Sequence, residues 1–410
     1  MRLVIVVPNF PQLSETFIIS KFAGLVDVGW DAHIVCQQAA LADWEQYRLL
    51  AARPELKHRI HQRWPHQPRL IAVLLWLPAF IITFIRAPGL TWRYWREGWR
   101  LLGAKTVGQF YLDAVIIGLA PDIVHFEFGA LAVGQTRLKK MLGCYLSVSF
   151  RGYDLNYVGL DDPDFYGEVW RTVDAIHVLG NDLWQRALRR GCPPDLPHAC
   201  IPPAIDIQFF MRDDLEPQEE PVDAERPLRI LSVGRLEWKR GYEYALTAVR
   251  LVKERGIPFE YRIIGSGRFL EALAFARHEM GLEEHVHFLG GQPQSVIVEA
   301  MKWADVFLHP AVSEGFSNAV LEAQAMELPV VCTDSDGLVE NVADELSGFI
   351  VPRRDPDLLA ARLIQLAGDR QLRRRMGLEG RARVAHGFRI ENQPAAFDQF
   401  FRGMVTTRAR

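Results

Sequence analysis

The sequence predicts a parallel α/β protein made of two doubly wound domains, and three observations lead to this fold class. The chain has 410 residues, which is long for one hydrophobic core and enough for two domains of about 200 residues each. Short apolar runs alternate with longer stretches of helical periodicity, as βαβ units require. This alternation stops once, at an acidic and proline-rich stretch over residues 202–227, and then starts again.

The apolar runs are typical of buried strands in parallel sheets. Before the proline-rich stretch they are Leu3–Val7, Ala32–Val35, Ile123–Phe126, Leu146–Phe150, Ala175–Val178 and Ala199–Ile201. After it they are Leu228–Val233, Tyr261–Ile264, Val286–Phe288, Val306–His309, Val330–Thr333 and Phe349–Val351. Open α/β sheets bind ligands beyond the carboxyl ends of their strands, so two Rossmann-like domains are expected to face a cleft.

The same pattern sets the expected domain boundaries. Residues 1–205 are predicted to form an N-terminal Rossmann-like domain that carries an additional helical segment over residues 59–105. Residues 206–386 are predicted to form the second domain. Residues 387–410 are expected to form a C-terminal helix that packs back on the N-terminal domain.

Composition excludes several classes of protein. Hydrophobic residues make up 49% and charged residues 24% of the chain, which is typical of a globular protein, and the net charge of −3 argues against a nucleic-acid partner. The five cysteines are odd in number and contain no Cys-x-x-Cys pair, which indicates neither a disulfide framework nor a zinc site. The first apolar run meets Pro8 after five residues, too early for a signal peptide, and a cytoplasmic location is expected.

A basic, tryptophan-rich segment interrupts the first half. Residues 70–85 contain no charge, but this run is shorter than the ~20 residues that span a bilayer and includes Pro78. From Arg59 to Lys105 there are eight basic residues and one acidic residue, Glu97. The same stretch holds five of the eleven tryptophans.

Two interpretations of this segment remain open, because periodicity does not separate a buried helix from an interfacial one. In the first, it lies peripherally on the anionic inner face of the cell membrane. A tryptophan stripe and a neighbouring arginine stripe would then share one helix: Trp92, Trp95 and Trp99, with Arg93, Arg96 and Arg100. In the second, it is a helical hairpin packed on the N-terminal domain with solvated arginines.

Cations and glycines follow the first two strands of the second half. The segment "SVGRLEWKRG" places Arg235, Lys239 and Arg240 just beyond a strand end, where they could clamp a diphosphate. The segment "IIGSG" places Gly265 at the next strand end, where a ligand could approach the backbone closely. The alternative for the basic run is a solvated helix start.

Two glutamates flank a glycine-containing turn in "HPAVSEGFSNAVLEAQAM". Glu314 is predicted to lie on the loop, and Glu322 one to two turns inside the helix that follows. The N-terminus of that helix offers unpaired N–H groups, which suit phosphate or sugar hydroxyls. The alternative is a capping carboxylate together with a surface salt-bridge partner.

In order, "VGRLEWKRG", "IIGSG", "VHFLG", "ADVFLHPAVSEGFSNAVLEAQAMELPVV" and "GFIVP" resemble the donor-binding half of the retaining glycosyltransferases of family 4, two-domain enzymes of GT-B fold. The resemblance covers about residues 228–385. It implies that Glu322 holds the ribose of a nucleotide sugar and that Glu314 lies beside the sugar ring. Arg235, with Arg240 or Lys239 where the family usually has one lysine before the glycine, would neutralise the diphosphate.

Further donor contacts follow from the same resemblance. They are implied for Gly265, Leu289, Gly315, Phe316, Ser317 and Asn318, the last four through backbone amides. No Asp-x-Asp follows a strand end in the donor half in a way that would hold a divalent metal. We therefore expect no metal and no cofactor, with the cations taking the role of a metal.

The N-terminal half is similar to a narrower group, the exopolysaccharide and colanic-acid-type transferases, through "FPQLSETFI", "DIVHFEFG" and "SFRGYD". This similarity implies that Ser14, Glu15 and Thr16 form a loop facing the diphosphate and the acceptor, and that His125 is a catalytic side chain in the cleft. Arg151 stands where relatives often carry a histidine that contacts sugar. The alternatives are a helix N-cap for the loop and a satisfied core position for His125.

Together, these resemblances imply a retaining transferase that moves a hexose from a nucleotide sugar, with UDP the expected nucleotide, to a glycan or lipid-linked acceptor in exopolysaccharide biosynthesis. Because a fold does not fix a function, two other classes stay open. One is an isomerase or phosphorylase on the same fold, such as a nucleotide-sugar 2-epimerase. The other is a non-catalytic subunit that binds nucleotide sugars.

Overall fold

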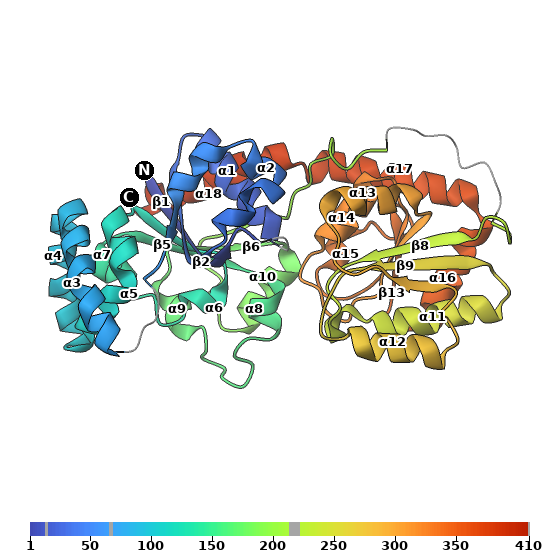
Figure 1. Ribbon diagram of the computed structural model, residues 1–410, viewed down its shortest axis with the longest axis horizontal. Coiled ribbons are helices and arrows are strands. Elements are labelled where there is room, and N and C mark those ends of the chain that lie inside the picture. Colours follow the sequence, from blue (N-terminus) through green and yellow to red (C-terminus); the bar gives the residue numbers. More distant parts are fainter. Residues whose placement is uncertain (13–14, 65–68, 213–221, 409–410) are drawn as a thin grey trace. The chain divides into compact units, whose positions relative to one another are not determined.

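The computed structural model describes residues 1–12, 15–64, 69–212 and 222–408, and the chain divides into two compact units (Figure 1). Unit 1 comprises Met1–Leu179, Leu183–Ile201 and Gln393–Arg410. Unit 2 comprises Gly180–Asp182 and Pro202–Asn392. Each unit contains one parallel sheet flanked by helices, which confirms the predicted fold class.

The sheet of unit 1 has seven strands in the order β3-β2-β1-β4-β5-β6-β7. Their bounds are β1 Arg2–Phe10, β2 Asp31–Ala39, β3 Ile60–Gln62, β4 Ile123–Phe126, β5 Tyr145–Phe150, β6 Ala175–Val178 and β7 His198–Cys200. The six predicted strands are all present. The edge strand β3 was not predicted, because only one of its three residues is apolar and the strand therefore has no apolar run in the sequence.

The sheet of unit 2 has six strands in the order β10-β9-β8-β11-β12-β13. Their bounds are β8 Leu228–Val233, β9 Phe259–Ile264, β10 Val286–Phe288, β11 Val306–His309, β12 Val330–Thr333 and β13 Gly348–Val351. All six were predicted. The order reverses between β8 and β11, which is where doubly wound sheets carry ligands.

The helices fill the connections between the strands. In unit 1 they are α1 Thr16–Asp27, α2 Arg48–Ala51, α3 Arg69–Arg86, α4 Pro88–Leu102, α5 Lys105–Leu119, α6 Gly129–Ala132, α7 Leu138–Leu142, α8 Gly152–Asn156, α9 Gly167–Thr172, most of α10 Asn181–Arg189, and α18 Gln393–Arg408. In unit 2 they are α11 Tyr242–Glu254, α12 Leu270–Glu279, α13 Gln294–Trp303, α14 Asn318–Ala325, α15 Leu338–Asn341, α16 Pro356–Gly368 and α17 Arg370–Gly387.

The last helix, α18, belongs to the core of unit 1. Its Phe397 and Phe401 are buried in the same cluster as residues of β1 and α1. Trp30 donates a hydrogen bond from Nε1 to Asp398 Oδ1 at 2.8 Å. A Cβ atom on Gly24 of α1 would collide with the ring of Pro394, so a glycine at this point lets the two helices approach closely.

The segment from α3 to α5 forms a helical layer within unit 1. Thr83 in α3 donates to the carbonyl of Ala114 in α5 at 3.3 Å, and Trp76 donates to the carbonyl of Val107 at 3.0 Å. Trp95 of α4 packs against Trp76, with ring centroids 5.9 Å apart. Trp95 is therefore partly covered by α3, whereas Trp92 and Trp99 on the same side of α4 are exposed.

We expect Phe401→Ala to destabilise unit 1, because the Phe401 side chain is fully buried against Trp30 and His125. Loss of a buried phenylalanine typically lowers the free energy of unfolding by about 3–5 kcal/mol. Urea unfolding monitored by tryptophan fluorescence measures this change, with the exposed Leu378→Ala in unit 2 as the control. Equal unfolding midpoints for the two variants would contradict the assignment of α18 to the core.

Candidate functional site

The residues expected to bind the donor follow the carboxyl ends of four neighbouring strands in unit 2. Arg235 follows β8, Gly265 follows β9, Leu289 follows β10 and Glu314 follows β11. These strands lie side by side in the order β10-β9-β8-β11. Residues spread over about eighty positions of sequence are therefore brought to one edge of the sheet.

Two loops at this edge are joined through their backbones. The carbonyl of Lys239, after β8, accepts hydrogen bonds from the amides of Val312 at 2.8 Å and Ser313 at 3.2 Å, after β11. Gly241 has φ +65°, and a Cβ atom there would collide with the carbonyl oxygen of Pro310. Only glycine fits this close approach without strain, so the cation-bearing loop and the Glu314 loop have a fixed relation to each other.

Arg240, Glu314 and His309 form a compact polar group on these loops. Arg240 makes a short ion pair with the Glu314 carboxylate. His309 Nε2 lies 3.4 Å from Glu314 Oε2 and 3.5 Å from Arg240 Nη1. Burial and the charge of Arg240 hold the pKa of His309 well below its usual range, so this imidazole is neutral. His309 was not among the predicted site residues, although its place as the last residue of β11 is a signal that could have identified it.

The other two cations share the carboxylate of Glu237, which was also not among the predicted site residues. Glu237 Oε2 lies 3.2 Å from Lys239 Nζ, and Glu237 Oε1 lies 3.6 Å from Arg235 Nη1. Burial alone would raise the pKa of Glu237, but the two cations hold that pKa below its usual value. With Arg240 and Glu314 included, three cations face two carboxylates, and the group carries a net positive charge.

The loop before α14 is held by side chains from the next strand connections. Asp336 Oδ2 accepts hydrogen bonds from Ser313 Oγ at 2.5 Å and from the Glu314 amide at 3.1 Å. Arg353 Nη1 donates to Asp336 Oδ1 at 3.1 Å and to the carbonyl of Val312 at 3.2 Å. These bonds fix the backbone on which Glu314 stands.

The residues from Gly315 to Asn318 lead into the start of α14, but one of them differs from expectation. The Ser317 amide, expected to face the ligand, donates to Asn341 Oδ1 at 3.1 Å. The Asn341 side chain also donates to the Ser317 carbonyl at 3.0 Å, and Ser317 Oγ caps α14 by accepting from the Val320 amide at 3.4 Å. Ser317 therefore anchors the loop rather than presenting its amide.

Glu322 lies in the second turn of α14 and differs from the other carboxylates at this edge. Its side chain is half-buried, and burial raises the pKa of its carboxyl to about 7. Among the residues that the structure describes, none makes a hydrogen bond or ion pair with the Glu322 carboxylate. A desolvated carboxylate with unused acceptor capacity is suited to hydroxyl donors from a ligand.

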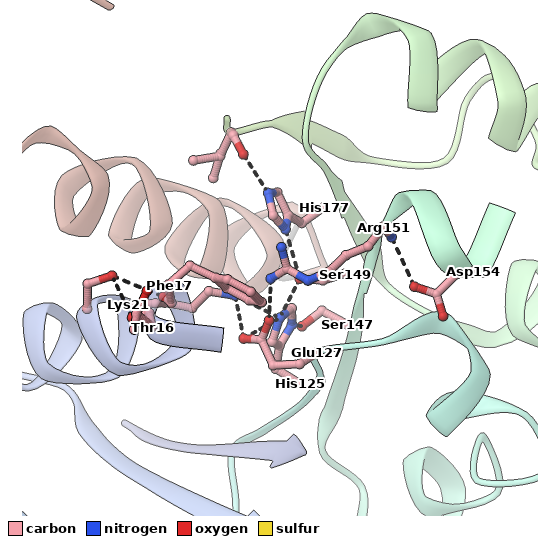
Figure 2. Close-up of polar contacts among 12 residues, drawn as sticks. Thr16, Phe17, Lys21, His125, Glu127, Ser147, Ser149, Arg151, Asp154 and His177 are labelled. Carbon is pink, nitrogen blue, oxygen red and sulfur yellow. Dashed lines mark hydrogen bonds and ion pairs between the residues drawn. The ribbon is translucent and has the colours of Figure 1, made fainter. Parts of the chain in front are cut away.

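Unit 1 contains a second polar group, at the ends of β4 and β5 (Figure 2). The fully buried Glu127 makes a short ion pair with Lys21 of α1, and its other oxygen lies 2.9 Å from Arg151 Nη2. Burial lowers the pKa of Lys21 to about 8 against the opposing effect of Glu127. Burial would raise the pKa of Glu127, but the neighbouring Lys21 holds it well below its usual range. The carboxylate is therefore charged at neutral pH.

His125 is enclosed in this group and has no exposed surface. Its Nδ1 lies 2.8 Å from Ser147 Oγ and its Nε2 lies 2.9 Å from Ser149 Oγ, which in turn lies 2.8 Å from His177 Nδ1. Burial lowers the pKa of His125 to about 3, so the ring is neutral. The expectation of a catalytic side chain is corrected here: His125 is a core histidine whose two ring nitrogens are both satisfied.

Arg151 is the member of this group that reaches solvent, with 13% of its side chain exposed. Its guanidinium lies 3.7 Å from the ring centroid of Phe17, directly after Thr16 at the start of α1 (Figure 2). Glu15 is the N-cap of α1 and makes no side-chain capping bond. Ser14 lies outside the described residues. The structure thus brings Arg151 close to the first turn of α1, where two of the expected loop residues stand.

Comparison with known proteins agrees with this geometry. The profile of the family "Glycosyl transferases group 1" matches residues 214–383. The chain is 30% identical over 387 residues to the amylovoran biosynthesis glycosyltransferase AmsK of Erwinia amylovora, covering 90% of this chain and 91% of that protein. It is 29% identical to the putative colanic acid biosynthesis glycosyltransferase WcaL of Escherichia coli, covering 87% and 88%.

Solved structures show the same fold at low sequence identity. HepE of Anabaena, in complex with UDP-glucose, has a TM-score of 0.74 at 14% identity and covers 99% of this chain and 100% of its own. Sucrose-phosphate synthase of Thermosynechococcus elongatus has a TM-score of 0.72 at 17% identity, with the same coverage. Fold and sequence thus define a two-domain transferase of GT-B fold. The chain belongs to the group 1 glycosyl transferases, family 4, and is a glycosyltransferase enzyme.

The pKa of Glu322 generates a prediction about stability. A carboxyl whose pKa is raised by folding from about 4.3 to about 7 destabilises the fold progressively as the pH rises through that window. We therefore expect Glu322→Gln to raise the thermal unfolding midpoint relative to the wild type at pH 8 but not at pH 5. The exposed Glu379→Gln is the control. An equal loss of stability at both pH values would contradict the desolvated state of Glu322.

Proposed function

We propose that this glycosyltransferase transfers a hexose, with retention of configuration, from a UDP-sugar to a glycan or lipid-linked acceptor in exopolysaccharide biosynthesis. The observation that carries the proposal is the arrangement at the strand ends of unit 2. There the Glu322 carboxylate, which has no side-chain partner among the described residues, and a net positive group share one edge. The names of AmsK and WcaL support polysaccharide synthesis. The complex of HepE with UDP-glucose supports UDP as the nucleotide.

In this proposal, the donor lies along the edge formed by β8, β9, β10 and β11. Glu322 accepts hydrogen bonds from the ribose hydroxyls, a role that fits its unused acceptor capacity. Gly265 and Leu289 let the nucleotide approach the ends of β9 and β10. The first turn of α14 lies beside the sugar, with the amides of Gly315, Phe316 and Asn318 next to the ligand.

The cations stabilise the leaving diphosphate. Arg235 and Lys239 share Glu237, so a diphosphate would give them a second and more highly charged partner. Arg240 is engaged with Glu314, which it holds beside the position of the sugar ring. Fixed charges of this kind stabilise negative charge as it develops in a transition state, without having to reorganise.

The transfer itself exchanges one bond to the anomeric carbon for another. The bond from that carbon to the diphosphate oxygen breaks, and a bond to an acceptor hydroxyl oxygen forms on the same face. The departing diphosphate takes the hydroxyl proton. Glu314 stands beside this carbon and stabilises positive charge on the ring, while His309, being neutral and 3.4 Å from Glu314, orients the carboxylate.

Unit 1 is proposed to receive the acceptor near the start of α1. Glu15 and Thr16 stand at the N-cap and first turn of α1, and Arg151 reaches the same turn through its contact with Phe17. Ser14, which precedes them in the sequence, is proposed to share this role. Two cations, Arg151 and Lys21, are paired with one carboxylate, Glu127, so these three side chains together carry one positive charge. An acceptor that carries phosphate or carboxylate fits this charge.

Donor binding is tested by calorimetry with UDP-glucose, UDP-galactose, GDP-mannose and ADP-glucose. We expect a UDP-sugar to bind best, and Glu322→Ala to lower the binding free energy by roughly 1.5–3 kcal/mol through the loss of charged hydrogen bonds. Glu379→Ala is the control. Unchanged affinity in Glu322→Ala would show that Glu322 does not bind the ribose. Tighter binding of GDP-mannose than of the UDP-sugars would show that the nucleotide is GDP and not UDP.

The role of the cations is tested by turnover in membranes that contain the natural acceptor. We expect Arg235→Ala to lower the rate of sugar transfer at least ~100-fold, the scale on which one fixed electrostatic stabiliser acts. The exposed Arg374→Ala should transfer at the wild-type rate. Near-normal transfer by Arg235→Ala would contradict the assignment. An epimerised nucleotide sugar formed without acceptor would instead show a 2-epimerase.

A further inference from the structure

The helix α3 exposes an apolar surface that the transferase reaction does not use. Leu74, Leu77, Ile81 and Ile85 recur at three- and four-residue spacing, which places them on one side of the helix. Their exposed fractions run from 47% for Ile81 to 75% for Leu74. Ile82 and Phe84, on either side of this row, are 42% and 46% exposed. Soluble proteins rarely leave such a continuous apolar face uncovered.

The opposite side of α3 is also apolar and accounts for the packing of the helix. Ala79 and Thr83 are buried, and Phe80 packs against Phe110 of α5 with ring centroids 5.7 Å apart. The helix therefore carries apolar residues on both sides, of which one packs against other helices and the other is exposed. Helices of this kind lie in a protein core or in lipid. Figure 1 shows α3 and α4 in the outer layer of unit 1, beyond α5 and α7 from the sheet.

Aromatic residues of α4 border this apolar face. Trp92 and Trp99 are 70% and 59% exposed and lie two turns apart. Trp95, between them, contacts Trp76 and Phe80 of α3 with ring centroids 5.9 and 6.4 Å apart. Because Trp92, Trp95 and Trp99 share one side of α4, the two exposed rings stand on the side next to α3. Tryptophan prefers the boundary between hydrocarbon and water.

Exposed arginines lie beyond the aromatic border. Arg93, Arg96 and Arg100 follow the tryptophans around α4, and all three are exposed. Glu97 is the one acidic residue between Arg69 and Lys105, and it pairs with Arg96 at 2.9 Å and Arg100 at 3.4 Å. Across the surface, an apolar centre is thus followed by tryptophans and then by cations. This order matches the layers of an anionic bilayer, from acyl chains to head groups.

We propose that α3 and α4 form a docking surface that inserts into one leaflet of an anionic membrane, with α3 in the acyl region and the α4 arginines at the phosphates. None of the described helices is both long and apolar enough to cross a membrane, so this surface lies in the leaflet without spanning it. Both interpretations left open by the sequence then apply to this segment. The segment packs on unit 1 through α5 and at the same time exposes an interfacial face. It does not depend on the transferase reaction.

A co-sedimentation experiment with the full chain tests this surface. The probe is a vesicle of phosphatidylcholine and phosphatidylglycerol, compared with a vesicle of phosphatidylcholine alone. We expect binding to the anionic vesicle that weakens with salt, and residual binding at high salt from the apolar face. The triple variant Leu77→Glu, Ile81→Glu, Ile85→Glu should abolish binding at every salt concentration. The triple variant Arg93→Glu, Arg96→Glu, Arg100→Glu should lower the partition coefficient at least ~100-fold at low salt.

Matched controls separate this surface from general effects of charge. Leu346, Leu358 and Leu378 are exposed leucines in unit 2, and their triple replacement by glutamate should bind like the wild type. Arg189, Arg374 and Arg375 are exposed arginines outside α4, and their triple replacement by glutamate is the control for net charge. All variants are first compared by thermal unfolding, which exposed substitutions should leave nearly unchanged.

Two outcomes would overturn the proposal. Vesicle binding by the α3 variant equal to that of the wild type would show that this face does not enter lipid. Absence of vesicle binding by the wild type, together with a dimer in sedimentation velocity that the α3 variant loses, would show that a second copy covers the face. Neither outcome bears on donor binding, which is measured without membranes, so failure of this proposal leaves the proposed transferase function intact.

Discussion

The geometry of unit 2 depends on one backbone connection, in which the Lys239 carbonyl accepts the amides of Val312 and Ser313. This connection ties the loop that carries the cations to the loop that carries Glu314, although the two loops follow different strands. It requires a glycine at position 241, because any side chain there would collide with the Pro310 carbonyl. A fixed backbone spacing lets Arg240 hold Glu314 without reorganisation when a ligand arrives.

Electrostatics at this edge oppose stability and favour binding. The Glu322 carboxyl is desolvated and has no partner among the residues that the structure describes, and burial raises its pKa to about 7. The fold therefore loses stability as the pH rises toward that value. Perturbed carboxylates that are held in this way are typical of functional positions. In the core of unit 1, by contrast, the buried Glu127 is paired with both Lys21 and Arg151. The aromatic rings of α18 then cover His125 and His177 in that group.

Much of the fold could be predicted from the sequence, because parallel strands buried on both faces leave long apolar runs. All twelve predicted strands are present, whereas β3 has only Ile60 as an apolar residue and no periodicity to reveal it. The strand-end residues of the candidate site were recognisable from their motifs. His309 and Glu237 were missed because their roles depend on contacts with Glu314, Arg235 and Lys239 that only the folded loops create.

Side-chain direction could not be predicted to the same degree. The strand pattern around His125 is compatible with a side chain either in a cleft or in the core. In the structure, two serines on the neighbouring strand contact both ring nitrogens, and the side chain lies in the core. The tryptophans of α4 share one periodicity, yet Trp95 turns toward α3 while Trp92 and Trp99 stay exposed. Ser317 stands in the loop expected to contact the ligand, but its amide donates its hydrogen bond to the side chain of Asn341. Each of these outcomes depends on a partner from another element.

A crystal structure of the protein with UDP tests the central claim most directly, because that claim is the placement of the donor at the carboxyl ends of β8, β9, β10 and β11. The account predicts ribose hydroxyls within hydrogen-bonding distance of the Glu322 carboxylate and the diphosphate beside Arg235 and Lys239. Density for the nucleotide elsewhere, or a ribose turned away from Glu322 with the diphosphate far from both cations, would contradict it.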